Sequence, residues 1–160
     1  MRTWLRMLVF GTVLAIGGAS VASAATATDP AVGTWKLNVE KSKFSSTNAL
    51  KSQTRTYVQT DNGLKLTFTG VAADGSAVSG ESTYKYDGKD YPISGSNDYD
   101  TLAVKRVNSH NATSTQKKAG KVVGTTTRTI SKDGKTLTLK HKGKNAKGES
   151  DDSTMVFEKQ

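Results

Sequence analysis

The sequence predicts an all-β fold, a single antiparallel up-and-down β-barrel of about eight to ten strands. Three observations lead to this prediction. Short segments in which apolar and polar residues alternate follow one another along the chain, as in strands with one solvent-facing side. Asn-Gly and Asp-Gly pairs, which supply the positive φ of tight hairpins, lie between them. No long segment has helical periodicity, and closing such a sheet into a barrel removes its two open edges.

Each expected strand follows from its own pattern. One segment sets Leu64, Leu66 and Phe68 against polar residues at the alternate positions, and another does the same with Leu137 and Leu139. The expected strands, in order, are 34–39, 53–60, 64–71, 77–86, 102–107, 112–118, 122–130, 136–142 and 154–158.

Turn signals lie between most of these segments, so the strands they join should be antiparallel neighbours in the sequence. The signals are Asn62-Gly63, Asp74-Gly75, Asp87-Gly88, Asp133-Gly134 and Lys147-Gly148. Residues 40–52 are the one longer connection, expected as a loop or a short helical turn over a barrel mouth, with Phe44 and Leu50 docked there. Residues 91–100 form a second loose region, because Pro92 confines any strand there to an edge or a kink.

The N-terminal segment has the features of a secretory signal peptide. Arg2 and Arg6 flank the start of the apolar run 7–16, and Ala-Ser-Ala at 22–24 is a small-residue cleavage site. We expect cleavage after Ala24, which assigns residues 1–24 to the signal peptide and 25–160 to one barrel domain. The apolar run is too short to span a bilayer, which takes about 20 residues. We therefore expect a soluble periplasmic or secreted protein with no transmembrane segment in the mature chain.

Composition narrows the function classes. The chain has no cysteine, so the exported domain is expected to be stable without disulfides. Its net charge is +9, and loss of Arg2 and Arg6 would leave +7; scattered lysines either keep the surface solvated or attract anionic lipid weakly. No nucleophile elbow, phosphate-binding glycine loop or metal-ligand spacing stands out, so we expect no enzyme, no cofactor and no metal site. The basic runs lack interleaved aromatic residues, and nucleic acid is therefore not an expected partner.

Two stretches carry a resemblance to a known superfamily. "AVGTWKL" at 31–37 is similar to the opening of lipocalins and fatty-acid-binding proteins, and "TTTRTISKDGKTLTL" followed by "TMVFEK" is similar to the last three strands of fatty-acid-binding proteins. The chain thus resembles the calycin superfamily, which implies a lipocalin-like barrel. In calycins the equivalent tryptophan plugs one end of the barrel, which implies a structural role for Gly33 and Trp35. The same opening also resembles small secreted bacterial proteins.

This chain departs from the family pattern at the family's ligand clamp. Fatty-acid-binding proteins hold the ligand carboxylate with an Arg-x-Tyr pair on the final strand, and Met155 and Phe157 stand at the matching positions. A second family arginine would match Thr129. Arg128 lies one place earlier, so it is expected on the opposite face unless a bulge intervenes. These departures weaken an inference of fatty-acid binding.

The expected inner face of the barrel is the candidate ligand site. Small residues in the segments 112–118 and 122–130 should leave space inside. Arg106 shares a face with Leu102 and Val104 and, if that face is inward, needs an anionic partner or ligand. Tyr84 and Tyr86 share a face that is either the inner or the outer one. The candidate ligand-binding residues are Leu66, Phe68, Tyr84, Tyr86, Leu102, Val104, Arg106, Leu139, Met155 and Phe157.

Two function hypotheses remain open. The leading one is an exported, non-catalytic protein that holds a small, partly apolar molecule inside the barrel. The alternative is an envelope structural or interaction protein that contacts anionic lipid or glycolipid through a basic outer surface and holds nothing inside. His141 shares the face of Leu137 and Leu139 and is expected as a hydrogen-bonded core residue rather than a haem ligand. His110 is expected in a turn, and neither histidine has an evident acid partner.

Overall fold

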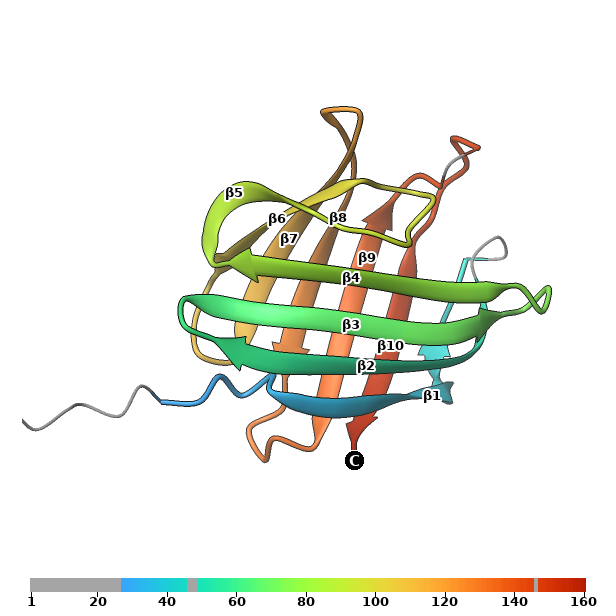
Figure 1. Ribbon diagram of the computed structural model, residues 1–160. Coiled ribbons are helices and arrows are strands. Elements are labelled where there is room, and N and C mark those ends of the chain that lie inside the picture. The colour runs from blue at the N-terminus through green and yellow to red at the C-terminus, as the bar shows by residue number, and fades with distance from the viewer. Residues whose placement is uncertain (1–26, 46–48, 146) are drawn as a thin grey trace, which may run out of the picture.

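The chain folds into one antiparallel sheet of ten strands (Figure 1). The computed structural model describes residues 27–45, 49–145 and 147–160, and the expected signal peptide with its cleavage site lies outside them. The strands are β1 (Gly33–Lys43), β2 (Leu50–Thr60), β3 (Gly63–Ala72), β4 (Ala77–Lys85), β5 (Asp87–Pro92), β6 (Thr101–Arg106), β7 (Asn111–Lys118), β8 (Lys121–Ile130), β9 (Thr136–Gly143) and β10 (Ser153–Lys159). The predicted all-β antiparallel barrel is confirmed. Among the described residues, no helix is long and apolar enough to cross a membrane.

The strands form a meander whose two halves are joined by the first and last strands. The order in the sheet is β4-β3-β2-β1-β10-β9-β8-β7-β6-β5, so β1 pairs with both β2 and β10. In Figure 1, β1 to β4 cross in front of β6 to β10. The side chains between the two layers form the interior of a flattened barrel, and its largest fully buried members are Trp35, Phe157, Leu64 and Leu137.

The barrel closes along a seam between its two edge strands, β4 and β5. There the backbones of Glu81 and Ser94 exchange two hydrogen bonds, of 3.1 Å and 2.9 Å. The prediction that Asp87-Gly88 joins two paired strands as a tight hairpin is wrong. Asp87 pairs with Lys105 of β6, and Gly88, at φ +74°, lies within a register shift of β5. At Asp87-Gly88 the chain therefore passes from β4, at one edge of the sheet, to β5, at the other edge.

Two segments predicted as loose are partly strand. Residues 40–43 continue β1 beyond a register shift after Asn38, and the hydroxyl of Ser42 donates to the Asn38 carbonyl at 2.7 Å. These residues lack an apolar pattern because this part of β1 is largely exposed, as is Val39. Phe44 and Leu50 pack against the core, as expected of them. Residues 87–92 form the edge strand β5, with Pro92 at its end.

Trp35 closes one end of the barrel. Its side chain is fully buried, and its indole Nε1 donates a 2.7 Å hydrogen bond to the carbonyl of Ala31 in the segment before β1. The Nζ of Lys159 lies 5.1 Å from the centre of the indole ring. Gly33, at φ +130°, turns the chain into β1 between these contacts, a conformation that other residues rarely adopt. Gly33 and Trp35 thus both take part in the packing at the start of β1.

Candidate ligand-binding site

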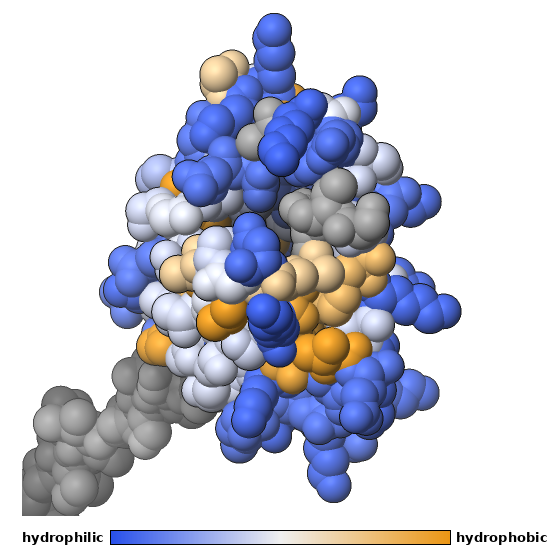
Figure 2. Space-filling view, turned by 90° about the vertical axis from the view of Figure 1, so that its right-hand side faces the viewer, coloured by the Kyte–Doolittle hydropathy of each residue, from blue (hydrophilic) through white to orange (hydrophobic). Residues whose placement is uncertain are grey.

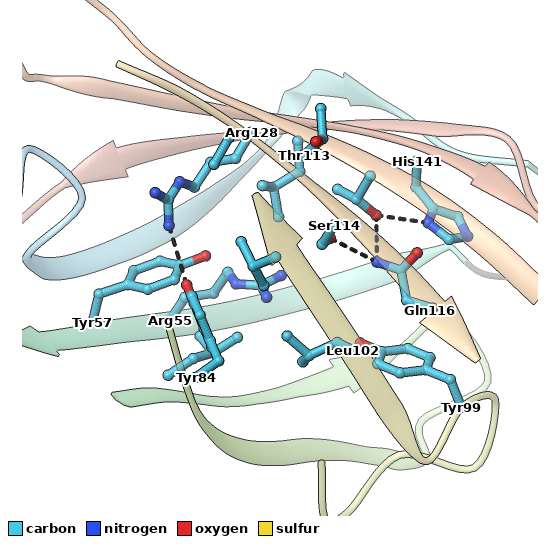
Figure 3. A pocket seen from close by; sticks show the side chains of 15 residues that line it. Arg55, Tyr57, Tyr84, Tyr99, Leu102, Thr113, Ser114, Gln116, Arg128 and His141 are labelled. Carbon is cyan, nitrogen blue, oxygen red and sulfur yellow. Dashed lines mark hydrogen bonds between the residues drawn. The ribbon is translucent and has the colours of Figure 1, made fainter. Parts of the chain in front are cut away.

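A cavity of about 90 Å³ lies inside the barrel (Figure 3). About half of its lining residues have apolar or small side chains, which agrees with the space that the sequence predicts beside β7 and β8. Five of the ten candidate ligand-binding residues line it: Leu66, Tyr84, Leu102, Val104 and Leu139. The other lining residues are Arg55, Tyr57, Tyr99, Ala112, Thr113, Ser114, Gln116, Thr126, Arg128 and His141.

Two arginines give this cavity a positive charge. Arg55 and Arg128 are its permanently charged lining residues, and none of the described lining residues is acidic. Figure 3 shows the Arg128 guanidinium next to Tyr57 and hydrogen-bonded to the Tyr84 hydroxyl, with the Arg55 side chain nearby. A buried guanidinium is unfavourable unless an anion or a set of acceptors compensates it. The electrostatics of the cavity therefore favour an anionic occupant.

Arg55 is held by aromatic rings and an amide. Its guanidinium lies 5.0 Å from the centre of the Phe68 ring and 5.7 Å from that of Phe157, and it donates to Oε1 of Gln53 at 3.3 Å. Its Nε is buried without a hydrogen-bond partner, and no carboxylate of the described residues forms an ion pair with it. Phe68 and Phe157, two of the candidate ligand-binding residues, thus support Arg55 and do not line the cavity.

Arg128 is buried and bonded to two tyrosine hydroxyls. Its Nη1 donates to the Tyr84 hydroxyl at 3.3 Å and its Nη2 to the Tyr86 hydroxyl at 2.6 Å, while its Nε has no partner. Burial raises the pKa of Tyr84 above its ordinary value and that of Tyr86 to about 12. Both phenols therefore stay neutral at physiological pH, and neither neutralises the guanidinium.

A carboxylate, Asp29, completes the closed end of the barrel. It lies in the segment before β1, and its Oδ2 accepts hydrogen bonds from the Tyr86 hydroxyl at 2.6 Å and from Arg106. Its Oδ1 accepts from the Ala31 amide at 2.8 Å and lies 3.9 Å from Nη2 of Arg128. Burial by itself raises the pKa of Asp29, but the hydrogen bonds and the arginine charges outweigh it and lower that pKa below the usual 3.8.

Arg106 and Tyr86 belong to this closed end and do not line the cavity. The Arg106 guanidinium lies 4.0 Å from the centre of the Tyr86 ring, and its side chain is 37% exposed. Arg106 was expected to need an anionic partner or ligand if its face is inward, and that partner is Asp29 of the same chain. Tyr84 and Tyr86 both point inward, with their rings edge to face at 5.9 Å, which decides the question of their face. Met155, the remaining candidate, is partly buried against the core.

A second cavity, of about 110 Å³, adjoins the first at the opposite end from Asp29. The two share Tyr99, Gln116 and His141, and the other lining residues of the second are Asp98, Val123, Lys144 and Asp151. His141 Nδ1 is 2.9 Å from the Thr126 hydroxyl oxygen, so the prediction of a hydrogen-bonded core histidine is confirmed. The prediction that it lacks an acid partner is wrong, because Oδ2 of Asp151 lies 3.5 Å from its Nε2. In the described part of the chain, no group of three acidic, histidine or cysteine side chains is placed to hold a metal ion.

The expectation that Arg128 faces outward is also wrong. On β8 the buried positions are Gly124, Arg128 and Ile130, with Thr126 half-buried on the same face. Arg128 is therefore inward without a bulge beside it, and Ile130, two residues later, was the signal that could have shown it. Asp29, Arg55 and Gln116 were not predicted as site residues from the sequence. No apolar alternation surrounds them, and no local pattern reports that distant segments bring them together.

Comparisons with known proteins find one similar structure. No family model and no curated protein match this sequence. Among solved structures, the zebrafish ileal bile acid-binding protein, crystallised with cholic acid, aligns with a TM-score of 0.49 and 14% identity, covering 82% of this chain and 99% of that chain. A likeness at this level says nothing about the ligand or the site residues of this chain. The fold itself is a ten-stranded, nearly closed antiparallel meander.

Proposed function

We propose that this protein is an exported, non-catalytic binding protein whose barrel holds a small, partly apolar anion beside Arg55 and Arg128. The observation behind this proposal is the cavity's charge. Two arginines line it, no acidic residue of the described chain does, and both guanidinium groups keep a buried Nε without a partner. A carboxylate or another planar oxyanion would accept these hydrogen bonds and balance the charge.

Asp29 does not supply this balance. It bonds Arg106 and approaches Arg128 only at 3.9 Å, and it forms no ion pair with Arg55. Of the two guanidinium groups that line the cavity, only that of Arg128 approaches Asp29, and that carboxylate also pairs with Arg106. Arg128 spans the boundary, with Nη2 toward the closed end and the rest of its guanidinium beside the cavity.

The size of the cavity limits the ligand. Pockets for drug-sized molecules have volumes of about 300–1,000 Å³, whereas a cavity of about 150 Å³ in another protein holds one benzene ring. At about 90 Å³, with about 110 Å³ adjoining, the interior suits a single ring or a short chain. The apolar side chains of Leu66, Leu102 and Val104 would cover such a group.

The test is calorimetric titration of the purified protein with benzoate and with benzamide, its neutral near-isostere. We expect benzoate to bind at least tenfold more tightly than benzamide, at physiological salt where contacts to surface lysines are screened. Arg55→Gln should weaken benzoate binding about tenfold or more, since a charge-assisted hydrogen bond contributes about 1.5–3 kcal/mol. Lys140→Gln, the same charge change at an exposed position of β9, is the matched control and should leave the affinity unchanged.

Equal affinities for benzoate and benzamide, or equal losses in the two variants, would overturn the proposal. In the alternative of a working basic outer surface, Lys41, Lys65 and Lys117 would add little free charge, because each forms an ion pair with a carboxylate of the same chain. Binding to anionic vesicles that persists at physiological salt would favour that alternative.

A further inference from the structure

We propose that the ligand of this cavity carries a hydrogen-bond donor, a hydroxyl or an amide N–H, at the end opposite its anionic group, and that Oε1 of Gln116 accepts it. This inference rests on the proposed function and adds the chemical class of the ligand: a compact acid with a distal hydroxyl or amide. The observation behind it is an unpartnered buried acceptor inside the barrel.

Gln116 is 5% exposed, and one end of its amide is fully engaged. Its Nε2 donates to the Ser114 hydroxyl at 3.0 Å and to the Thr126 hydroxyl at 2.9 Å, while its Oε1 is buried with no partner. Figure 3 shows the amide held between these two hydroxyls. A buried polar atom that makes no hydrogen bond costs free energy, because it has lost its bond to water without a replacement. A ligand that donates to Oε1 recovers this cost, and one that buries it with a methyl group does not.

The neighbouring hydroxyls fix the orientation of the Gln116 amide. The Thr126 hydroxyl stands between Gln116 and Nδ1 of His141, each at 2.9 Å. When Thr126 donates to the imidazole, its oxygen accepts from Nε2 of Gln116, which directs Oε1 away from both hydroxyls. Gln116 lines both cavities, so its unpartnered Oε1 belongs to a side chain that a ligand in either volume contacts.

Gln116 and Arg128 lie at opposite ends of the same two strands. Gln116 of β7 pairs with Gly124, and Arg128 of β8 pairs with Ala112, so the two rungs are four residues apart. At roughly 3.4 Å per residue this is about 14 Å along the barrel. A hydrogen bond of about 2.9 Å at each end leaves room for one ring or a short chain between the two polar groups of the ligand. The wall between them contains Ala112 and Leu139, which suits an apolar middle.

The experiment compares 4-hydroxybenzoate with 4-methylbenzoate, in which a methyl group of similar size replaces the hydroxyl. Both acids are titrated calorimetrically at pH 7, where the phenol is neutral, into the wild type, Gln116→Met and Gln116→Glu. We expect 4-hydroxybenzoate to bind the wild type about tenfold more tightly, the factor that about 1.4 kcal/mol represents. In Gln116→Met this preference should vanish or reverse while 4-methylbenzoate still binds, which also shows that the variant is folded. Gln116→Glu keeps an acceptor oxygen and should keep the preference.

The outcomes separate this inference from the proposed function. If both acids bind the wild type equally well, the donor-accepting role of Gln116 is wrong while the anion site stands. If the preference for the hydroxyl persists in Gln116→Met, another group binds the hydroxyl and the inference is overturned. If neither acid binds while the protein is folded, the proposed function itself fails.

Discussion

The hydroxyl of Tyr86 donates a hydrogen bond of 2.6 Å to Oδ2 of Asp29, although 57 residues separate the two in the sequence. Arg106 and Arg128 approach the same carboxylate from β6 and β8. Asp29 thereby joins the segment before β1 to the corner between β4 and β5, where the meander has no continuous ladder. This cluster closes one end of the barrel and leaves the other end for the ligand.

Replacing Asp29 with asparagine should lower the free energy of unfolding by roughly 2–3 kcal/mol at pH 7. Removing one partner of a buried ion pair costs about 3–5 kcal/mol, and the partial exposure of Arg106 reduces this value. Urea unfolding measures the difference. Asp61→Asn, in the exposed turn after β2, is the control and should change the stability by less than about 0.5 kcal/mol. A similar effect of both substitutions would contradict a closing role for Asp29.

The difference in unfolding free energy between the wild type and Asp29→Asn should depend on pH in a defined way. Because the pKa of Asp29 is lowered in the fold, its stabilisation is complete above the unfolded-state pKa of about 3.9 and is lost as the pH falls through the lower folded-state pKa. The stability difference between the wild type and Asp29→Asn should thus stay constant from pH 7 to about 5 and shrink below about 4. Urea unfolding at pH 7, 5 and 3 tests this, and an undiminished difference at pH 3 would show that the carboxylate charge is not responsible.

Trp35 should matter for stability and not for ligand binding. It is fully buried but lines neither cavity, so Trp35→Ala should cost about 3–5 kcal/mol and Trp35→Phe less. Benzoate affinity of Trp35→Phe should stay within about twofold of the wild type, whereas Arg55→Gln should lose affinity and keep its stability. Calorimetric titration and thermal unfolding of both variants check this opposite pattern. A loss of affinity in Trp35→Phe would place the ligand against the indole.

The seam between β4 and β5 should be the first part of the barrel to open. A Cβ added at Gly95, which has φ +82°, would lie 2.8 Å from the Ser79 carbonyl oxygen across the seam. Gly95→Ala should therefore speed the hydrogen exchange of the Glu81 and Ser94 amides relative to those of the β2–β3 ladder. Gly75→Ala has a similar backbone strain at φ +90° but no neighbour within 4 Å, and is the matched control. Equal exchange in the two variants would mean that the close approach does not hold the seam.

Strands with one apolar face were predictable, and the polar interior was not. On β3, Leu64, Leu66 and Phe68 alternate with polar residues, so both the strand and its inner face follow from the sequence. On β8, threonine occupies both faces, and Arg128 was expected outside because it lies one residue before the position that matches the family arginine, Thr129. The bonds of Asp29 to Tyr86 and Arg106 span long stretches of chain, and no local pattern reports such a contact.

The most direct test of an anion site inside this barrel is a benzoate titration followed by NMR of the arginine Nε–Hε groups. The described residues contain three arginines, Arg55, Arg106 and Arg128, and single Arg→Lys variants assign their signals. We expect saturable shifts of the Arg55 and Arg128 signals with one common affinity, because both residues line the cavity and their Nε groups are unpartnered. The Arg106 signal should stay in place, since that side chain is bonded to Asp29. Signals of Arg55 and Arg128 that do not move, or that move no more than with chloride, would contradict an anion site inside this barrel.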